Sequence, residues 1–409
     1  NTSPFLLGEM LTGVQRVWQA IVNSEKILVF GDYDADGNTS VVTMTEGLKY
    51  LGANVDWDIP QREDGYGLSV KSLAKTLADR KNIDVIITVD NGIKAKDTAE
   101  ELRKLGIDFI VTDHHDIDPD EYPSAYAVIN PKRDDAYPEC HLSGCGVAYK
   151  FIQGLCLYIE SLKTDGKIPA PWMKKYGAID LKTYPDNWLD MVTIGTIADM
   201  MPLTSEENRN LVKRGLEKIK TDTRLGLRTL VDQTYTKDIS GFGVETIGFD
   251  IAPMINAAGR IGDSTIAAKL FMSNDIMETS LWAQELAVLN KQRKGLQASK
   301  KEELVKLIQQ QNLDKAPAII AYLPDCKHGI LGLLAASVAQ DLEPEYVAVS
   351  DDNTKAYITL QENNAILVVD LLTNTIESIR PLGFANYSEG SGNSLDASDQ
   401  SGAILNTSG

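Results

Sequence analysis

Three short apolar runs constrain the fold of this chain more than any other feature. They span residues 27–31, 85–89 and 106–112, are rich in Val and Ile, and each is followed at once by acidic residues or histidines. Such runs, bounded by Gly and Asp, are typical of buried parallel strands. In an open α/β sheet the carboxyl ends of the strands line the crevice in which ligands bind. The sequence therefore predicts that three strands deliver carboxylates and imidazoles to one edge of a parallel sheet.

The residues that follow the runs form three clusters: Asp32, Asp34 and Asp36 before Gly37; Asp90 before Asn91 and Gly92; and Asp113, His114 and His115. Packed carboxylates repel one another unless a cation is bound. Oxygen ligands with one or two imidazoles suit Mn²⁺ or Mg²⁺, and a pair of such ions can activate a water for phosphoryl displacement. Turn formation and helix capping explain one such cluster equally well. Three clusters at strand ends favour a metal centre.

A further carboxylate, Asp199, lies within the largely apolar segment 195–202. An ionised Asp is rarely placed among apolar residues without a partner, so Asp199 is a candidate metal ligand. Helix capping before Pro202 is an equally good explanation from the sequence alone.

Composition narrows the kinds of function. A net charge of −18 argues against a general nucleic-acid coat protein, while permitting an enzyme with a local basic groove. No apolar stretch is long enough to span a bilayer and no secretory leader is expected, so no membrane partner is predicted. The four cysteines indicate a reducing cytoplasm. Cys140, His141 and Cys145 fit no standard zinc spacing, and buried thiols near the start of a helix at Gly144 are the favoured interpretation.

The order of the patterns predicts an α/β protein in which a parallel-sheet domain is joined by a long helix to a smaller α/β domain. The expected boundaries are 1–275 for the first domain, with a parallel βαβ part at about 20–135 and a helical part at about 144–275, then 276–312 for the linker helix and 313–409 for the smaller domain. Further expectations are helices at 40–51, 69–79 and 94–105, an exposed loop at 163–185, strands at 316–322 and 346–350 around a helix from near Gly329, and a loosely ordered end at 390–409.

With these motifs the chain resembles the DHH phosphoesterase superfamily, and within it the RecJ-like branch of single-strand DNA exonucleases. The matching stretches are 31–37, 59–62, 65–68, 88–92, 111–115, 130–133, 144–150, 195–203, 208–209, 255–260 and 328–332. They follow the family's order over residues from about 5 to 350. The Asp-His-His triplet identifies only the superfamily, whereas the Ile-Pro-x-Arg, Asn-Ala-Ala-Gly-Arg and His-Gly elements are specific to the branch.

The resemblance implies a catalytic DHH domain with a site for two Mn²⁺ or Mg²⁺ ions. One ion would be held by Asp36, Asp90, His114 and Asp199, and the other by Asp34 and Asp90 with Asp32, so that Asp90 bridges them. His115 would contact the scissile phosphate, and Asp113 completes the catalytic triplet.

The resemblance also implies a set of residues that bind nucleic acid or phosphate: Arg62, Tyr66, Asn256, Arg260 and His328. Arginine suits bidentate capture of phosphate, and residues 257–259 predict a small-residue loop that lets a phosphate approach Arg260. A solvated surface role is the alternative for both arginines. His328 would meet phosphate at a helix N-terminus, or lie merely exposed on a capped helix. Tyr66 would stack on a base, or pack as an ordinary half-buried Tyr.

The chain departs from the family near its end. Asn393 stands where the Gly-Ser-x-Arg-Ser element of the DHH-associated domain has arginine, no Gly-Gly-His element precedes Gly409, and no segment is expected to form the appended oligonucleotide-binding barrel. The alteration of this domain affects the expected preference for one end of the strand more than it affects the expected hydrolysis. The function implied is 5′-to-3′ hydrolysis of single-stranded DNA in repair, recombination or replication, with single-strand-binding or other repair and replication proteins as candidate partners. The alternatives are a phosphodiesterase of short oligoribonucleotides or cyclic dinucleotides, and a catalytically idle replication scaffold.

Overall fold

The computed structural model describes two units of the chain, residues 1–295 and 296–409, and each is considered by itself. The described residues are 2–65, 67–133, 137–234, 239–311, 321, 323, 326–342, 347–349, 355–360, 365–370 and 375–381. The predicted strand at 316–322, residue Tyr66 and the segment 390–409 with Asn393 therefore lie wholly or almost wholly outside the described residues.

A five-stranded parallel sheet forms the centre of the first unit, in the order β2-β1-β3-β4-β5. Its strands are β1 (Lys26–Phe30), β2 (Asn54–Asp58), β3 (Val85–Val89), β4 (Asp108–Thr112) and β5 (Ala127–Ile129). Because Phe30 pairs with Thr88 and Val89 with Thr112, the carboxyl ends of β1, β3 and β4 finish side by side. The predicted parallel α/β sheet is confirmed, and the three predicted runs are its central strands.

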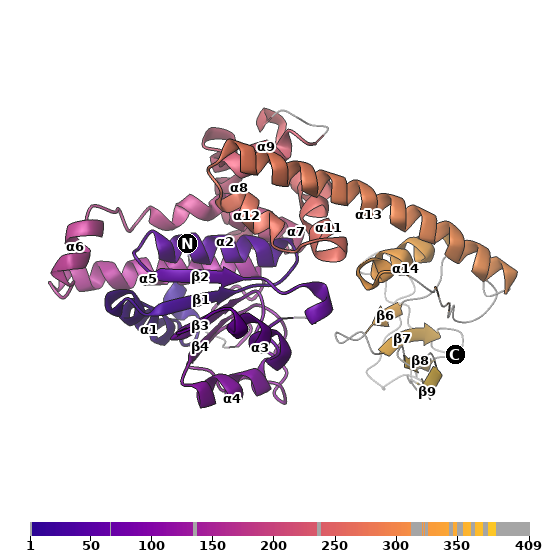
Figure 1. The fold of residues 1–409 in the computed structure, drawn as a ribbon, viewed down its shortest axis with the longest axis horizontal. Helices are drawn as coiled ribbons and strands as arrows, with labels where there is room; N and C mark the ends of the chain where they lie inside the picture. The colour runs from indigo at the N-terminus through magenta and orange to yellow at the C-terminus, as the bar shows by residue number, and fades with distance from the viewer. Residues whose placement is uncertain are drawn as a thin grey trace, which may run out of the picture. The chain divides into compact units, whose positions relative to one another are not determined.

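Helices cover both faces of this sheet, as the alternation of side chains along each strand requires. Ile27 and Val29 of β1 face a core built with α1 (Met10–Asn23), α2 (Ala35–Lys49) and α5 (Gly144–Thr164). Leu28 and Phe30 face a second core with α3 (Val70–Ala78) and α4 (Lys96–Leu105) (Figure 1). Burial on both faces explains why the central strands are continuous apolar runs rather than alternating ones.

The rest of the first unit is helical. Its elements are η1 (Pro4–Leu6), η2 (Arg62–Asp64), α6 (Ala170–Tyr176), η3 (Tyr184–Trp188), α7 (Leu189–Ala198), α8 (Glu206–Thr221), α9 (Leu225–Val231), η4 (Ile239–Gly241), α10 (Val244–Thr246), η5 (Ile247–Ile251), α11 (Ala252–Ile261), α12 (Ile266–Met272) and the first part of α13 (Ile276–Gln310). The long helix expected from the sequence is thus present as α13, whereas the domain boundaries at 275 and 312 stay predictions. No described helix has both the length and the apolar character needed to cross a bilayer.

Two expectations about local structure in the first unit are wrong. The helix expected from residue 40 begins at Ala35, because Asp34 caps it by accepting a hydrogen bond from the Gly37 N–H. The expected loop at 163–185 contains α6, which starts after Pro169 and buries Trp172. The Trp172 indole packs edge-on against Trp18 and donates to the Leu51 carbonyl, so this polar stretch is anchored by one aromatic side chain.

The second unit contains α14 (His328–Leu342) and an antiparallel sheet in the order β6-β7-β8-β9. Its strands are β6 (Val347–Val349), β7 (Lys355–Leu360), β8 (Ala365–Asp370) and β9 (Thr375–Pro381). The predicted helix near Gly329 and the predicted strand at 346–350 correspond to α14 and β6.

Candidate metal centre

The loop after β1 carries three aspartates, two of which are fixed by the start of a helix. Asp34 is the N-cap residue of α2, and Asp36 lies in its first turn. The two carboxylate oxygens of Asp36 accept hydrogen bonds from the N–H groups of Gly144 (2.6 Å) and Cys145 (3.0 Å), which begin α5. The partial positive charge of a helix N-terminus favours a carboxylate at this point. Asp36 is thereby held at the sheet edge with its orientation determined.

Asp90 follows β3 and is held against the same helix start. It adopts a φ of 62°, a region that non-glycine residues seldom occupy. A Cβ atom on Gly144 would overlap the Asp90 carboxylate, so only glycine permits this approach. His114 Nε2 lies 3.1 Å from Asp90 Oδ1, 3.5 Å from Asp199 Oδ2 and 3.9 Å from Asp36 Oδ2. Residues that are remote in the sequence thus converge on one imidazole nitrogen.

Three sets of possible ligand atoms result, each with its atoms within 4.8 Å of one another. The sets are Asp36 with His114 and Asp199, Asp32 with Asp34 and Asp90, and Asp90 with His114 and His115. The structure therefore brings together every residue of the two predicted ligand sets. It also places Asp90 at 3.1 Å from His114 of the first set and within the second, as a bridging position requires.

The charges of this cluster are unfavourable without a cation. Burial first, and then neighbouring carboxylates, raise the pKa values of Asp32, Asp36 and Asp90 well above the usual range. The same causes raise the pKa of Asp199 to about 6. Among the described residues, the buried Asp32 Oδ1 has no hydrogen-bond partner. Buried oxygen donors with an imidazole are the ligand set of Mn²⁺ or Mg²⁺, so the side chains fit such ions.

The structure disfavours the capping explanation of Asp199. Asp199 follows the last residue of α7, at the carbonyl end of the helix, and only its backbone N–H takes part in the cap. A carboxylate at a helix C-terminus meets the negative end of the helix dipole. Its position is therefore explained by the cluster rather than by the helix.

Asp113 and His115 form a hydrogen-bonded pair beside the ligand sets. Asp113 Oδ1 accepts from the backbone N–H groups of His114 and His115 and lies 2.8 Å from His115 Nδ1, while Oδ2 accepts from the Ile93 N–H. Burial alone would lower the pKa of His115, but the hydrogen bond and charge of Asp113 raise it to about 9. Burial and the charge of His115 lower the pKa of His114 to about 4. At neutral pH His115 is therefore a cation and His114 a neutral imidazole.

These pKa shifts predict a pH-dependent response to manganese. We expect saturating Mn²⁺ to stabilise the folded chain by about 3 kcal/mol at pH 7.5, and to do so far less at pH 5. The reason is that Asp199, with its pKa of about 6, and the other buried carboxylates bind protons as the pH falls and then no longer bind metal.

The stability of the metal-free chain should change with pH in the opposite direction. A carboxyl group whose pKa is raised by folding destabilises the native state when it is ionised, and Asp32, Asp36, Asp90 and Asp199 are four such groups. The raised pKa of His115 adds to their effect and the lowered pKa of His114 opposes it, so the free energy of unfolding should rise as the pH falls from 7 to 5. Thermal unfolding with and without MnCl₂ across this range measures both effects. An equal Mn²⁺ effect at pH 5 and pH 7.5 would contradict the assignment.

The predicted Arg62 site differs from a solvated surface arginine. Arg62 Nε donates to the Gly259 carbonyl at 2.9 Å, and its guanidinium lies 4.2 Å above the centre of the Tyr33 ring. Tyr33 stands between Asp32 and Asp34 in the sequence, so Arg62 is fixed against the loop that carries the carboxylates.

The predicted small-residue loop before Arg260 is wrong, because residues 257–260 lie within α11. A Cβ atom on Gly259 would overlap the Tyr33 carbonyl oxygen, so this glycine serves close packing against the loop after β1. Asn256, predicted to bind phosphate, accepts a hydrogen bond from the Ala35 N–H at 2.9 Å. The structure thus shows Asn256 holding the start of α2.

Arg260 lies in a group of cations that includes a residue not predicted from the sequence. Burial lowers the pKa of Arg260, and the charges of Arg62 and Arg293 lower it further, while Asp34 opposes them. Arg293 belongs to α13 and lies outside every motif of the sequence. Its only signal is its position one helical turn after the apolar residue Leu289.

The remaining predicted residues lie elsewhere. His328 begins α14 in the second unit and is exposed. The buried Cys145 thiol lies 3.3 Å from Thr43 Oγ1, while Cys140 is exposed. Cys145 is thus a buried thiol at the start of α5, as expected, whereas the expectation that Cys140 is also buried is wrong.

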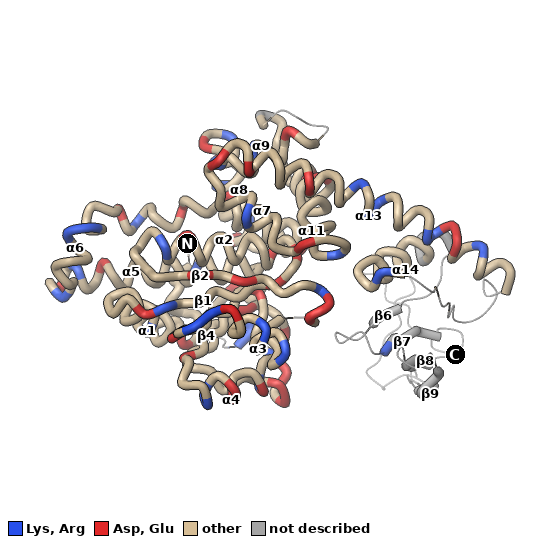
Figure 2. Tube along the Cα trace, in the orientation of Figure 1, with Lys and Arg blue, Asp and Glu red and all other residues tan. Residues whose placement is uncertain are grey.

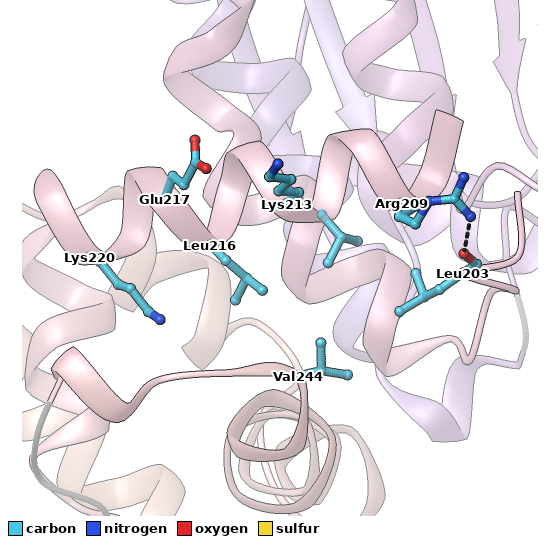
Figure 3. A pocket seen from close by; sticks show the side chains of 8 residues that line it. Leu203, Arg209, Lys213, Leu216, Glu217, Lys220 and Val244 are labelled. Carbon is cyan, nitrogen blue, oxygen red and sulfur yellow. Dashed lines mark hydrogen bonds between the residues drawn. The ribbon is translucent and has the colours of Figure 1, made fainter. Parts of the chain in front are cut away.

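A separate hollow of about 350 Å³ lies along α8. It is lined by Leu203, Arg209, Val212, Lys213, Leu216, Glu217, Lys220 and Val244 (Figure 3). It shares no lining residue with the carboxylate cluster.

Comparisons with known proteins agree with this fold. The model of the DHH family, N-terminal domain, matches residues 26–196, and that of the Choice-of-anchor I domain matches residues 292–408. The chain is 35% identical over 354 residues to the single-stranded-DNA-specific exonuclease RecJ of Bacillus subtilis, covering 86% of this chain and 41% of the relative. It is 32% identical over 353 residues to the Escherichia coli protein of that name, covering 83% and 58%. The chain thus spans about half the length of the curated relatives it matches.

Two solved structures are similar to the fold. An exonuclease RecJ bound to manganese matches with a TM-score of 0.69 and 29% identity, over 89% of this chain and 83% of that one. RecJ of Thermus thermophilus in complex with Mn²⁺ matches with a TM-score of 0.67 and 28% identity, over 89% and 48%. These matches define an α/β protein of the RecJ fold, similar to two structures solved with bound manganese. Residues 26–196 form a domain of the DHH family, and the chain is similar to RecJ proteins over most of its length.

Proposed function

We propose that this protein is a metal-dependent exonuclease that degrades single-stranded DNA from its 5′ end, in DNA repair, recombination or replication. The observation that supports this most is the convergence of five aspartates and His114 into the overlapping ligand sets around Asp90. Its relatives named as single-stranded-DNA-specific exonucleases support the choice of substrate.

In this proposal the ligand sets hold two Mn²⁺ or Mg²⁺ ions. Asp36, Asp90, His114 and Asp199 serve one ion, and Asp32, Asp34 and Asp90 the other. When bound, two such ions supply an activated water and neutralise charge on the phosphate. His114 is a neutral imidazole and can therefore coordinate an ion. Asp36 is already held in position by the start of α5 before an ion binds.

The protein's own cations act on the substrate. His115, protonated at neutral pH, donates a hydrogen bond to an oxygen of the scissile phosphate or to the leaving oxygen, while Asp113 fixes its ring. Arg62 and Arg260 bind phosphate of the same strand beside the loop after β1. His328 and Tyr66 stay candidates for further contacts with the strand.

We propose that residues 1–275 form the catalytic domain, 276–312 the linker and 313–409 a substrate-binding domain. Single-strand-binding or other repair proteins are the proposed protein partners. A cytoplasmic location is supported by the four free cysteines.

The test uses purified protein, Mn²⁺ and oligonucleotides labelled at the 5′ or the 3′ end. We expect mononucleotide or short products to be released first from the 5′ end of single strands, with little action on blunt duplex and none after chelation. Release only from the 3′ end would contradict the proposal. Faster turnover of dinucleotides or cyclic dinucleotides would favour the other phosphodiesterase activity, and metal-independent partner capture without hydrolysis would favour a scaffold.

A further inference from the structure

Arg293 lies where α13 packs against the turn between α11 and α12. Ala283 and Leu286 are buried on this face of the helix, and Leu289 lies so close to Gly262 that a Cβ atom there would be 2.8 Å from its Cδ1. Arg293 is one turn beyond Leu289, so its side chain projects from the same face toward the end of α11, where Arg260 stands. Basic residues recur along this helix (Figure 2), but Arg293 is half-buried while Lys294 beside it is exposed.

The guanidinium of Arg293 is held in one orientation. Asn290, three residues earlier in α13, accepts hydrogen bonds on Oδ1 from Arg293 Nε (3.2 Å) and Nη2 (3.0 Å). An arginine that is fixed through Nε has already lost side-chain entropy before a ligand binds. Its ordered guanidinium group therefore binds an anion with a smaller entropic cost.

Like charges gather here against their mutual repulsion. Arg293 and Arg62 both act on the half-buried Arg260, and burial together with these charges lowers its pKa. The chain as a whole has a net charge of −18, so a concentration of guanidinium groups is locally exceptional. Arg62 itself is fixed by the Gly259 carbonyl and the Tyr33 ring. Convergent, oriented guanidinium groups are the usual means of binding phosphate.

We infer that Arg293 is a third phosphate-binding residue, which acts with Arg62 and Arg260 on one phosphate of a single nucleic-acid strand. The nature of the ligand rests on the proposed function. Three positive charges match a terminal phosphate, which carries a charge of about −1.5 to −2, better than an internucleotide phosphate with a charge of −1. Comparing the binding of strands with and without a 5′ phosphate distinguishes a terminal phosphate from an internucleotide phosphate as the ligand.

The experiment measures binding of fluorescent 12-nucleotide single strands to the full chain in EDTA, so that no cleavage occurs. We expect Arg293→Gln to weaken binding of the 5′-phosphorylated strand by about tenfold, and to reduce the slope of log affinity against log salt by about 0.7. Arg293→Lys should recover part of the loss. Asn290→Ala, which keeps every charge, should weaken binding by a smaller factor without changing the slope.

The matched control is Lys294→Gln, which removes the same charge from the adjacent exposed position and should stay within twofold of the wild type. A 5′-hydroxyl strand that loses as much affinity as the phosphorylated one would assign Arg293 to the backbone instead of the terminus. Equal effects of Arg293→Gln and Lys294→Gln, or no binding by the wild type, would overturn the inference. If the protein shows no nuclease activity but its strand binding still depends on Arg293, the inference about Arg293 holds and the proposed function fails.

Discussion

Under the proposed function, replacing Asp90 by Asn should reduce the cleavage of single-stranded DNA by about 10³-fold or more, since loss of the proposed shared metal ligand removes several kcal/mol of transition-state stabilisation. Asp90 belongs to two of the three ligand sets and lies 3.1 Å from His114 Nε2. The amide keeps the size of the side chain but removes the charge and one strong oxygen ligand. Single-turnover rates at saturating Mn²⁺ measure the effect.

The metal-free variant supplies a second readout. Because burial and neighbouring carboxylates raise the pKa of Asp90, Asp90→Asn should leave the metal-free chain at least as stable as the wild type. Asp97→Asn, the same substitution at an exposed position of α4, is the control and should change neither property. An Asp90→Asn enzyme with more than a tenth of the wild-type rate would contradict the bridging role.

Replacing Arg224 by Leu should lower the free energy of unfolding by about 3–5 kcal/mol, because buried carboxylates would lose their counter-ion. Arg224 Nε donates to Asp190 at 2.6 Å, while Nη1 donates to Glu46 at 3.3 Å and to the Phe271 carbonyl at 2.8 Å. Asp190 is 1% exposed, so water could not replace the hydrogen bonds and charge that Arg224 provides. Urea unfolding measures the loss.

This network also joins the elements that carry the proposed metal ligands. Glu46 belongs to α2, whose first turn holds Asp36, and Asp190 belongs to α7, which Asp199 follows. Arg228→Leu is the matched control, since Arg228 forms a 4.0 Å pair with Asp232 in which both side chains are more than half exposed. Its loss should be below about 1 kcal/mol. Similar losses for the two variants would show that the network contributes no more than a surface pair.

The centre of the sheet could be predicted because burial on both faces leaves a plain signal, an unbroken Val/Ile run. The edge strand β2 has no such run: Asn54 to Asp58 alternates polar and apolar residues, and its side chains are exposed or half-buried. Helix α6 escaped prediction because a single buried Trp172 anchors it within a polar stretch. In each case tertiary contacts rather than local pattern determine the structure.

The candidate site divides in the same way. The carboxylates and histidines that follow β1, β3 and β4 could be predicted because chain order and strand parallelism force them to one edge. Asp199 follows a helix instead, and only the family resemblance placed it in a ligand set. The structural roles of Gly259 and Asn256 could not be predicted, because each depends on the packing of the loop after β1 against α11. Arg293 approaches from a helix that carries no motif, and the orientation of its guanidinium depends on Asn290. Contacts between remote helices leave no mark in a single sequence.

Anomalous diffraction from crystals grown with Mn²⁺ tests the central claim most directly. We expect two peaks about 4 Å apart, one beside His114 and Asp199 and one beside Asp32 and Asp34, with the Asp90 carboxylate between them. A single ion that does not touch Asp90, or no manganese signal at this sheet edge, would contradict the two-ion site.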